Sequence, residues 1–414
     1  THDPRRPQRK PPRPQEICEE EQTELAVLGT FGPPPPEFTT EHNDNPTLLL
    51  LFNNNEVGRL PMPFLHDGIP MPTRQATWTP PKEQPTQPDT DTTPESLLSA
   101  LAEPNNASKQ FIARQYDHEV QANTIIRPFV GPNALGPSPA TVIQPDPSSK
   151  RGLAIACGLT AETAGDPYTN AIAAVDQCVR NLVCVGADPK RIAILDNFCW
   201  PSCKRPENMA TLVRAAVGLR DAALLYRTPF ISGKDSLNNQ FTYNDPQTSQ
   251  PITIEIPPTL LVTGVAIIDD INTRTTMDLK PVDGSKLIRL FQCDEAIGES
   301  FLDVMYRLIT SDAVLASNTI GGQDTVLAAA QMLIAADKDR GLELTPPSNP
   351  SGFTDFLLQI SPDADPLTTP DFVGVSDVGI VNRTGALTSS LTDAPLHVLT
   401  ADLRNAFTKT FKDW

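Results

Sequence analysis

Long hydrophobic runs are absent from this sequence of 414 residues, and none approaches the ~20 apolar residues that a membrane-spanning helix requires. Residues 1–14 also lack the hydrophobic core of a signal peptide. Basic residues are scarce, because 33 Lys and Arg face 50 Asp and Glu and leave a formal net charge of −17. This balance argues against nucleic acid or an anionic membrane as the main partner. We therefore expect a soluble, cytoplasmic protein.

Glycine is also sparse at 22 residues, whereas the 43 prolines are about twice the ~5% average, so many turns should be stiff. The seven cysteines are an odd number. Four of them lie in apolar segments, where a free thiol packs as a small hydrophobic side chain, namely Cys157, Cys178, Cys184 and Cys199. Cys199 and Cys203 have no second pair at zinc-finger spacing. We therefore predict free thiols and no zinc site there.

The chain is long enough for two or three domains of ~100–200 residues each. We divide it into five segments on composition and periodicity. They are a basic, proline-rich arm (1–15), the tail of a preceding α/β domain (16–78), a linker (79–95), a large α/β domain (96–275) and a C-terminal α/β domain (276–414). Helical and strand patterns alternate in the last two segments, which predicts a mixed α/β fold class.

Two long amphipathic helices are predicted at residues 168–185 and 209–226, because apolar side chains recur there at helical spacing. Each is followed by a predicted strand, at 191–195 and 229–231. Further strands are predicted at 25–28, 48–52, 56–60, 260–268, 287–291 and 356–360, and further helices at 17–22, 96–103, 313–315, 325–336 and 401–411.

One short motif combines residue types that can hold a phosphate and its metal ion. Gly233, Lys234, Asp235 and Ser236 follow one another in a segment that reads as a tight turn. About thirty-five residues earlier, a hydrophobic strand is predicted to end on Asp196. Two strand ends separated by an amphipathic helix are how an α/β sheet usually presents a ligand site at its carboxyl edge. The alternative is a structural turn in which Lys234 and Asp235 pair with neighbouring residues.

Two other polar residues have both a structural and a functional interpretation. His118 could act as a general base, but the flanking Asp117 and Glu119 favour an ion-paired structural histidine. Asp166 precedes Pro167 at the start of a predicted helix, which fits an ordinary helix N-cap as well as a ligand contact.

Several segments of this region together resemble the second half of phosphoribosylformylglycinamidine synthase, an ATP-dependent enzyme of purine synthesis. They are residues 107–109, 114–121, 165–168, 180–182, 185–189, 196–200 and 231–239. Residues 64–70 resemble the segment that precedes this half of the family's enzyme. The resemblance implies an α/β domain that contributes strands to a shared β-barrel, followed by a smaller α/β domain.

The resemblance also implies the roles of individual residues. Asp196, Gly233 and Lys234 match nucleotide-binding positions, and Lys234 stands where some members have a metal-binding asparagine. Ser236 matches a substrate-binding position, and Asn181 matches a metal-binding asparagine. The implied cofactors are ATP or ADP with Mg²⁺. No catalytic residue is assigned, because the half that carries the family's catalytic histidine loop is absent. The implied partners are that missing first half, or a like chain, and a glutaminase subunit that supplies ammonia.

The sequence departs from the family at acidic positions of the metal site. An expected aspartate is Pro139, an expected glutamate is Gln177, and the two aspartates of a late loop are replaced by Ser317 and Ile320. Because Mg²⁺ prefers hard anionic oxygens, these changes remove charge that the ion and a polyphosphate would need. The nearby acids Asp176 and Asp324 are candidates for compensation.

Three hypotheses for function follow. The first is a half or subunit of phosphoribosylformylglycinamidine synthase, an ATP-dependent C–N ligase that amidates formylglycinamide ribonucleotide, with this chain inactive alone. The alternative is a pseudoenzyme that keeps the fold and serves a structural or regulatory role in a larger complex. A third, weaker hypothesis is a different ATP-using member of the same superfamily.

Overall fold

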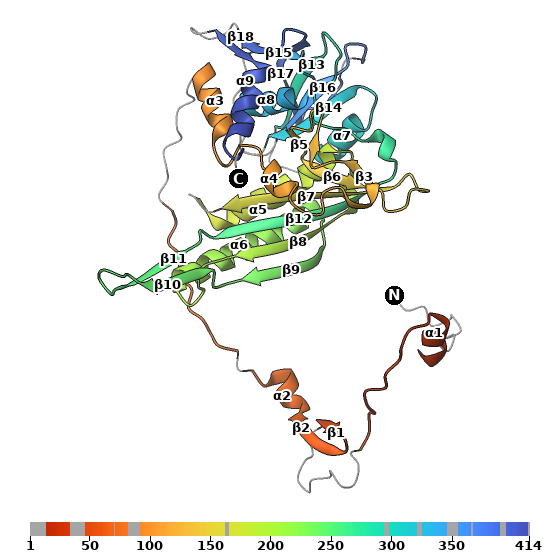
Figure 1. The fold of residues 1–414 in the computed structure, drawn as a ribbon, viewed down its shortest axis with the longest axis vertical. Helices are drawn as coiled ribbons and strands as arrows, with labels where there is room; N and C mark the ends of the chain where they lie inside the picture. Colours follow the sequence, from red (N-terminus) through yellow and green to blue (C-terminus); the bar gives the residue numbers. More distant parts are fainter. Residues whose placement is uncertain are drawn as a thin grey trace. The chain divides into compact units, whose positions relative to one another are not determined.

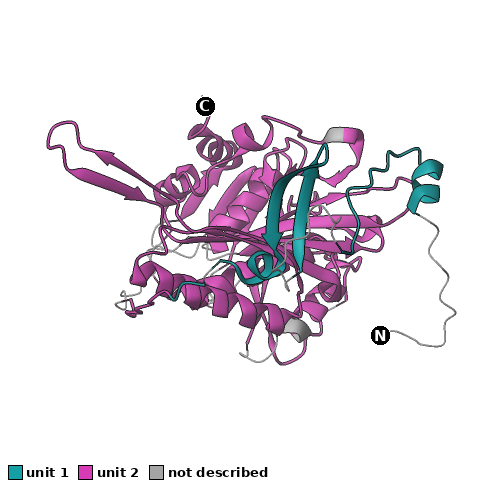
Figure 2. Cartoon of the chain, turned by 90° about the horizontal axis from the view of Figure 1, so that it is seen from below, with its two compact units in different colours: residues 1–73 teal, residues 74–414 magenta. Residues whose placement is uncertain are grey.

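The chain forms two compact units, Thr1–Thr73 and Arg74–Trp414, which are described separately (Figure 2). The computed structural model describes residues 14–33, 46–69, 71–81, 92–161, 165–293, 298–320, 325–345, 355–365, 367–389 and 395–412. Most of the predicted arm (1–15) and linker (79–95) therefore lies outside the described residues. The division of the chain into five segments remains a proposal.

The first unit exposes most of its described side chains. It contains α1 (Pro14–Glu20), β1 (Thr47–Phe52), β2 (Asn55–Pro61) and α2 (Met62–Asp67). β1 and β2 form the predicted antiparallel hairpin, and Asn53 and Asn54 make its turn with positive φ angles. The predicted strand at 25–28 is wrong, because these residues lie in irregular, exposed backbone. A strand needs a neighbour for its backbone hydrogen bonds, and no described segment pairs with this one.

The second unit contains a six-stranded and a seven-stranded sheet (Figure 1). The six-stranded sheet has the order β3-β6-β7-β12-β8-β9, formed by β3 (Thr124–Ile126), β6 (Ala140–Ile143), β7 (Gly152–Ala161), β12 (Thr259–Ile268), β8 (Ile192–Cys199) and β9 (Phe230–Ser236). Of the adjacent strand pairs in this sheet, only β8 and β9 are parallel, and a helix connects these two strands. Among the described strands, β3 and β9 are the edges of this sheet.

Two long helices pack together in this unit, α5 (Pro167–Cys184) and α6 (Pro206–Tyr226). α5 lies against β7 and β12 and also contacts β14 of the other sheet. Asp166 is the N-cap of α5, since its carboxylate accepts a hydrogen bond of 3.0 Å from the backbone N–H of Tyr168. The structural interpretation of Asp166 is therefore confirmed.

The face of the six-stranded sheet away from α5 is open. Along β12 every second residue is buried, and the residues between them, such as Leu261 and Val265, remain partly exposed. On β7, Leu159 is 57% exposed. A sheet usually buries an apolar face, so this one is suited to a covering partner.

The seven-stranded sheet has the order β14-β16-β13-β17-β15-β18-β19. Its strands are β13 (Lys286–Gln292), β14 (Val314–Ile320), β15 (Gly341–Leu344), β16 (Asp355–Ile360), β17 (Val373–Asn382), β18 (Ala386–Ser389) and β19 (Leu396–Leu399), and its helices are α7 (Gly298–Ile309), α8 (Thr325–Ala335) and α9 (Thr400–Lys409). The predicted helix at 313–315 is wrong, because these residues lead into β14. A short apolar run does not distinguish a helix from a buried strand, and pairing with β16 decides for the strand here.

Helix α3 (Pro94–Ala102), which opens the second unit's regular structure, packs against α9 near the other end of the chain. Leu97 and Leu101 of α3 are buried. Just beyond α3, the backbone N–H of Ser108 donates to the carbonyl of Phe407 at 2.9 Å. Segments about three hundred residues apart therefore form one part of the core.

A β-hairpin that the sequence patterns did not predict extends from the six-stranded sheet (Figure 1). It consists of β10 (Gln240–Asn244) and β11 (Pro251–Glu255). Phe241 pairs with Ile254, and Tyr243 pairs with Ile252, so one face of the hairpin is apolar. The remaining short elements are α4 (Gln110–Ala113), η2 (Val120–Ala122), β4 (Phe129–Val130), β5 (Gly136–Pro137), η3 (Pro189–Arg191) and η4 (Ile271–Thr273).

All seven cysteines are free thiols. Within the described residues, no helix combines the length and the hydropathy needed to cross a membrane.

Candidate functional site

The two motif segments lie side by side in the parallel strands β8 and β9. Asp196 pairs with Gly233, Asn197 with Lys234, and Cys199 with Ser236. The prediction of two strand ends is wrong in detail, because β8 continues to Cys199 and β9 runs through the motif to Ser236. Backbone pairing of β8 with both β12 and β9 holds these polar residues in extended conformation.

Gly233 leaves Asp196 uncovered on the face of the sheet that α6 lines. A Cβ atom at position 233 would lie 2.6 Å from Oδ1 of Asp196, so a side chain there would displace the carboxylate. Burial raises the pKa of Asp196 above its usual value, and the nearby carboxylate of Asp235 raises it further. The pair therefore presents a partly desolvated carboxyl group beside open space.

Lys234 and Ser236 point to the other face of the sheet, because side chains alternate along a strand. The Lys234 ammonium donates a hydrogen bond to the hydroxyl of Ser236. The structure thus places Asp196 and Gly233 on the α6 side of the sheet, and Lys234 and Ser236 on its open side. Since β9 is an edge strand of the sheet among the residues that the structure describes, a ligand at this edge can reach both pairs.

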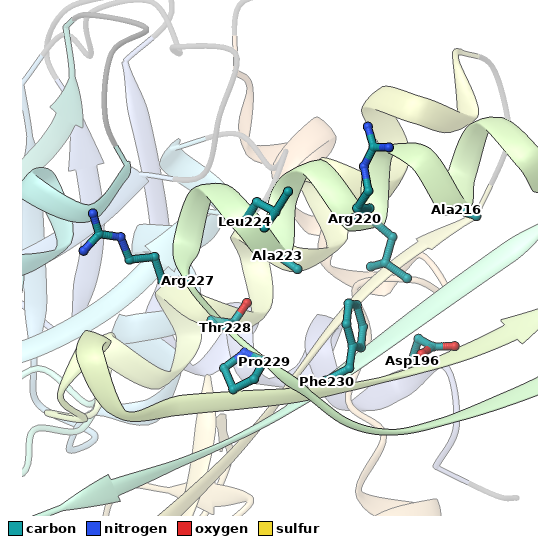
Figure 3. Close-up of a pocket in the computed structure, with 10 residues that line it drawn as sticks. Asp196, Ala216, Arg220, Ala223, Leu224, Arg227, Thr228, Pro229 and Phe230 are labelled. Atoms are coloured by element: carbon teal, nitrogen blue, oxygen red, sulfur yellow. The ribbon is translucent and has the colours of Figure 1, made fainter. Parts of the chain in front are cut away.

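A groove of about 690 Å³ lies beside Asp196, between α6 and β9 (Figure 3). It is lined by Asp196, Ala216, Leu219, Arg220, Ala223, Leu224, Arg227, Thr228, Pro229 and Phe230. The ring of Phe230 points toward α6, and Asp196 stands at one end. The sequence patterns did not predict these lining residues other than Asp196. The lining residues of α6 are spaced three or four positions apart, and any amphipathic helix shows this spacing.

Asn181 is buried, and protein groups occupy both ends of its amide. Its Nδ2 donates to the carbonyl of Cys157 at 3.0 Å, and its Oδ1 accepts from the hydroxyl of Thr319 at 2.6 Å. One turn earlier on α5, Oε1 of Gln177 accepts from the backbone N–H of Leu159 at 3.0 Å. Both amides therefore bind α5 to β7 or β14, and a metal-binding role for Asn181 stays a prediction.

Asp176 does not replace the missing glutamate at position 177, because its side chain turns into the core. Its Oδ1 accepts hydrogen bonds from Nε of Arg180, at 2.7 Å, and from the hydroxyl of Tyr226. Asp324 lies outside the described residues. Across the part of the chain that the structure describes, no three His, Cys, Asp or Glu side chains cluster to hold a metal ion. Pro139 and Gln177, at the expected carboxylate positions, supply no anionic oxygen for a Mg²⁺ ion.

His118 lies in an ion-pair cluster. Its Nε2 is 3.1 Å from Oε1 of Glu119, and Oε2 of Glu119 is 3.3 Å from Nε of Arg127. These contacts support the structural interpretation of His118.

Changing Asp196 to asparagine should stabilise the protein in a pH-dependent way. Because the folded state raises the pKa of this carboxyl group, it holds the proton more tightly than the unfolded chain does. The associated stability is present at acidic pH and is lost as the pH rises through the raised pKa. The variant should therefore melt at a higher temperature than the wild type at about pH 7, with a smaller difference at about pH 3. Calorimetric melting checks this, and an equal or lower Tm at neutral pH would contradict it.

Known proteins resemble this chain in the region of β8 and β9. Residues 138–254 match the family model described as AIR synthase related protein, N-terminal domain. The chain is 35% identical over 195 residues to phosphoribosylformylglycinamidine synthase subunit PurL of Gloeobacter violaceus, covering 45% of this chain and 24% of that protein. It is 34% identical over 193 residues to the subunit of Deinococcus radiodurans, covering 46% and 24%. The chain thus spans about a quarter of the length of these relatives.

The fold also matches a solved structure. The Thermotoga maritima PurLQS structure aligns with a TM-score of 0.54 at 18% identity, covering 82% of this chain and 50% of that chain. The chain therefore carries an AIR synthase related domain within a mixed α/β fold. It is a PurL-like protein, related to the PurL subunit of phosphoribosylformylglycinamidine synthase, and the predicted resemblance is confirmed.

Proposed function

We propose that this chain acts as the second half of a phosphoribosylformylglycinamidine synthase and binds ATP or ADP at Asp196 and Gly233. The observation that carries the proposal is the pairing of Asp196 with a glycine beside a groove of about 690 Å³. A structure of T. maritima PurL in complex with ATP has the same fold, with a TM-score of 0.50 at 18% identity. The synthase reaction would convert the amide of formylglycinamide ribonucleotide to an amidine, through a phosphorylated imidate that ammonia attacks.

Lys234 and Ser236 would face the substrate side in this proposal. An ammonium group is a point charge that can hold phosphate without a metal ion. In this chain Pro139 and Gln177 replace two carboxylates that hold Mg²⁺ in other members. The positive charge of Lys234 would therefore supply part of the positive charge that Mg²⁺ brings to the phosphates in those members. We accordingly expect nucleotide binding that does not require Mg²⁺.

The open face of the six-stranded sheet supports a partner half. A shared β-barrel would cover the partly exposed apolar residues of β7 and β12, and this sheet leaves both of its edges unpaired among the described strands. We propose that the partner is a first half of the synthase or a like chain, with a glutaminase subunit as the source of ammonia. The chain alone would not catalyse the reaction. The active form would be a cytoplasmic complex of these subunits.

The loss of acidic residues favours the second candidate function, a pseudoenzyme with a structural or regulatory role. Pro139 and Gln177 stand at expected carboxylate positions, and the amides of Gln177 and Asn181 are already bound by protein groups. In this alternative the groove beside Asp196 would remain without a nucleotide.

Calorimetric titration with ATP and ADP distinguishes the two functions. The wild type should bind with micromolar affinity in the presence of either Mg²⁺ or EDTA, and Asp196→Asn should weaken binding at least about tenfold. Asp245→Asn, at the half-buried start of the turn between β10 and β11, removes the same charge away from the site and should bind as the wild type does. No binding by the wild type under any condition would refute the nucleotide site and leave the structural function.

A further inference from the structure

The groove between α6 and β9 has a shape and polarity that the motif residues alone do not explain. On the α6 side, Leu219 lies between Ala216 and Ala223, and the two alanines leave space on either side of it. On the β9 side, the ring of Phe230 is 42% exposed and points toward the helix (Figure 3). An aromatic ring opposite alanine and leucine side chains makes a slot for a flat, apolar body.

Polar groups stand at the ends of this slot. Asp196 lies at one end, and its carboxyl group accepts hydrogen bonds. Thr228 lines the other end, where its buried Oγ1 has no hydrogen-bond partner among the described residues. A buried hydroxyl without a partner is costly, so a polar atom of a ligand would stabilise it.

The positive groups of the rim do not enter the slot. Arg220 and Arg227 contribute to its walls, but their guanidinium groups point away from Phe230 in Figure 3. The slot is therefore suited to an uncharged part of a ligand rather than to its phosphates. A purine base has the required form, because it is flat, stacks on aromatic rings, and carries amino and ring-nitrogen atoms at opposite edges.

We propose that this slot holds the purine base of the nucleotide, with the ring packed between Phe230 and Ala216 and with an amino group donating a hydrogen bond to Asp196. The phosphates extend out of the slot along β9, past Gly233. This inference rests on the proposed nucleotide site and adds the orientation of the nucleotide within it. It assigns base-binding roles to Phe230 and Ala216, which the sequence motif does not include.

Two pairs of variants test the slot. Phe230→Ala removes the stacking surface, and Ala216→Leu fills the slot with a side chain on an exposed helix position. The matched controls are their sequence neighbours outside the groove lining, Ile231→Ala on β9, at 60% exposed, and Val217→Leu on α6, at 37% exposed. Circular-dichroism melting of all four verifies that they are folded before any affinity is compared.

The probes are adenosine, ADP, purine riboside, which lacks the amino group, and tripolyphosphate, which lacks the base. Phe230→Ala and Ala216→Leu should weaken adenosine and ADP binding at least about tenfold, and leave tripolyphosphate binding and both controls unchanged. The wild type should prefer adenosine over purine riboside, and Asp196→Ala should remove that preference.

The outcomes separate this inference from the nucleotide site itself. If the wild type binds ADP and both slot variants bind it equally well, the base lies elsewhere and only the orientation is refuted. If the slot variants lose tripolyphosphate as well as ADP, the phosphates occupy the slot and the orientation is reversed. If the wild type binds none of the probes, the proposed nucleotide site falls together with the slot.

Discussion

Replacing Asp355 by alanine is expected to lower the free energy of unfolding by about 3–5 kcal/mol. Asp355 begins β16, and its Oδ2 accepts a hydrogen bond of 2.6 Å from Nε of Arg289 on the adjacent strand β13. Both residues are buried, with exposed fractions of 3% and 1%. Removing the carboxylate would leave the charge of Arg289 in the core without its counter-ion. Urea denaturation followed by circular dichroism gives the free energy directly.

Two controls separate the buried charge from a general effect on this sheet. Asp377→Ala breaks an ion pair on the same sheet, in which Nζ of Lys286 lies 3.8 Å from Oδ2 of Asp377 and both side chains are 61% exposed. This change should lower the free energy of unfolding by less than about 1 kcal/mol. The double change Arg289→Met with Asp355→Leu should recover most of the lost stability, because no unpaired charge remains. A loss below about 1 kcal/mol for Asp355→Ala alone would show that Arg289 finds another partner or water.

Adding one methyl group at Gly158 is expected to destabilise the protein by about 3 kcal/mol or more, at the upper end of overpacking effects. Its Cβ atom would lie 1.9 Å from the backbone carbonyl oxygen of Ala174 and 2.8 Å from the backbone nitrogen of Cys178. Both atoms belong to the body of α5, so the whole helix would have to move away from β7. Thermal melting of Gly158→Ala provides the measurement.

Gly264→Ala is the matched control on the neighbouring strand β12. Its Cβ atom would meet Sγ of Cys178 at 2.7 Å and Cδ1 of Leu182 at 2.8 Å, which are side-chain atoms that can rotate aside. The loss of stability should therefore be clearly smaller than for Gly158→Ala. Equal losses in the two variants would show that α5 is free to shift, and that the close approach to β7 is not a fixed feature.

The sequence predicts most of what local pattern determines. α5 and α6 begin and end within three residues of their predicted bounds, because apolar spacing and proline at the first turn are local signals. β9 is longer than predicted, since Ser232, Gly233 and Lys234 are typical of turns. Pairing with β8 along the whole motif outweighs that preference.

In the candidate site, too, the sequence predicts the local features but not those that depend on pairing between distant segments. The register of Asp196 with Gly233 depends on pairing between segments about thirty-five residues apart, which no local pattern specifies. The groove depends on Ala216 and Ala223, and alanine is the residue with the highest helix propensity. Its presence in a helix therefore does not indicate a groove. The prediction omits the β10–β11 hairpin, although apolar and polar residues alternate in both of its strands and such alternation is a strand signal. Its cross-strand pairs become visible only once the two strands are aligned.

The contact between α3 and α9 bears on how the protein is made. Because a ribosome releases the chain from its N-terminal side, Leu97 and Leu101 emerge long before residues 400–409 are available to cover them. During translation these leucines are an exposed apolar surface, which a chaperone would have to shield. Closing such a long loop also costs more entropy than a local contact, so docking of α9 should be a late and slow step of folding.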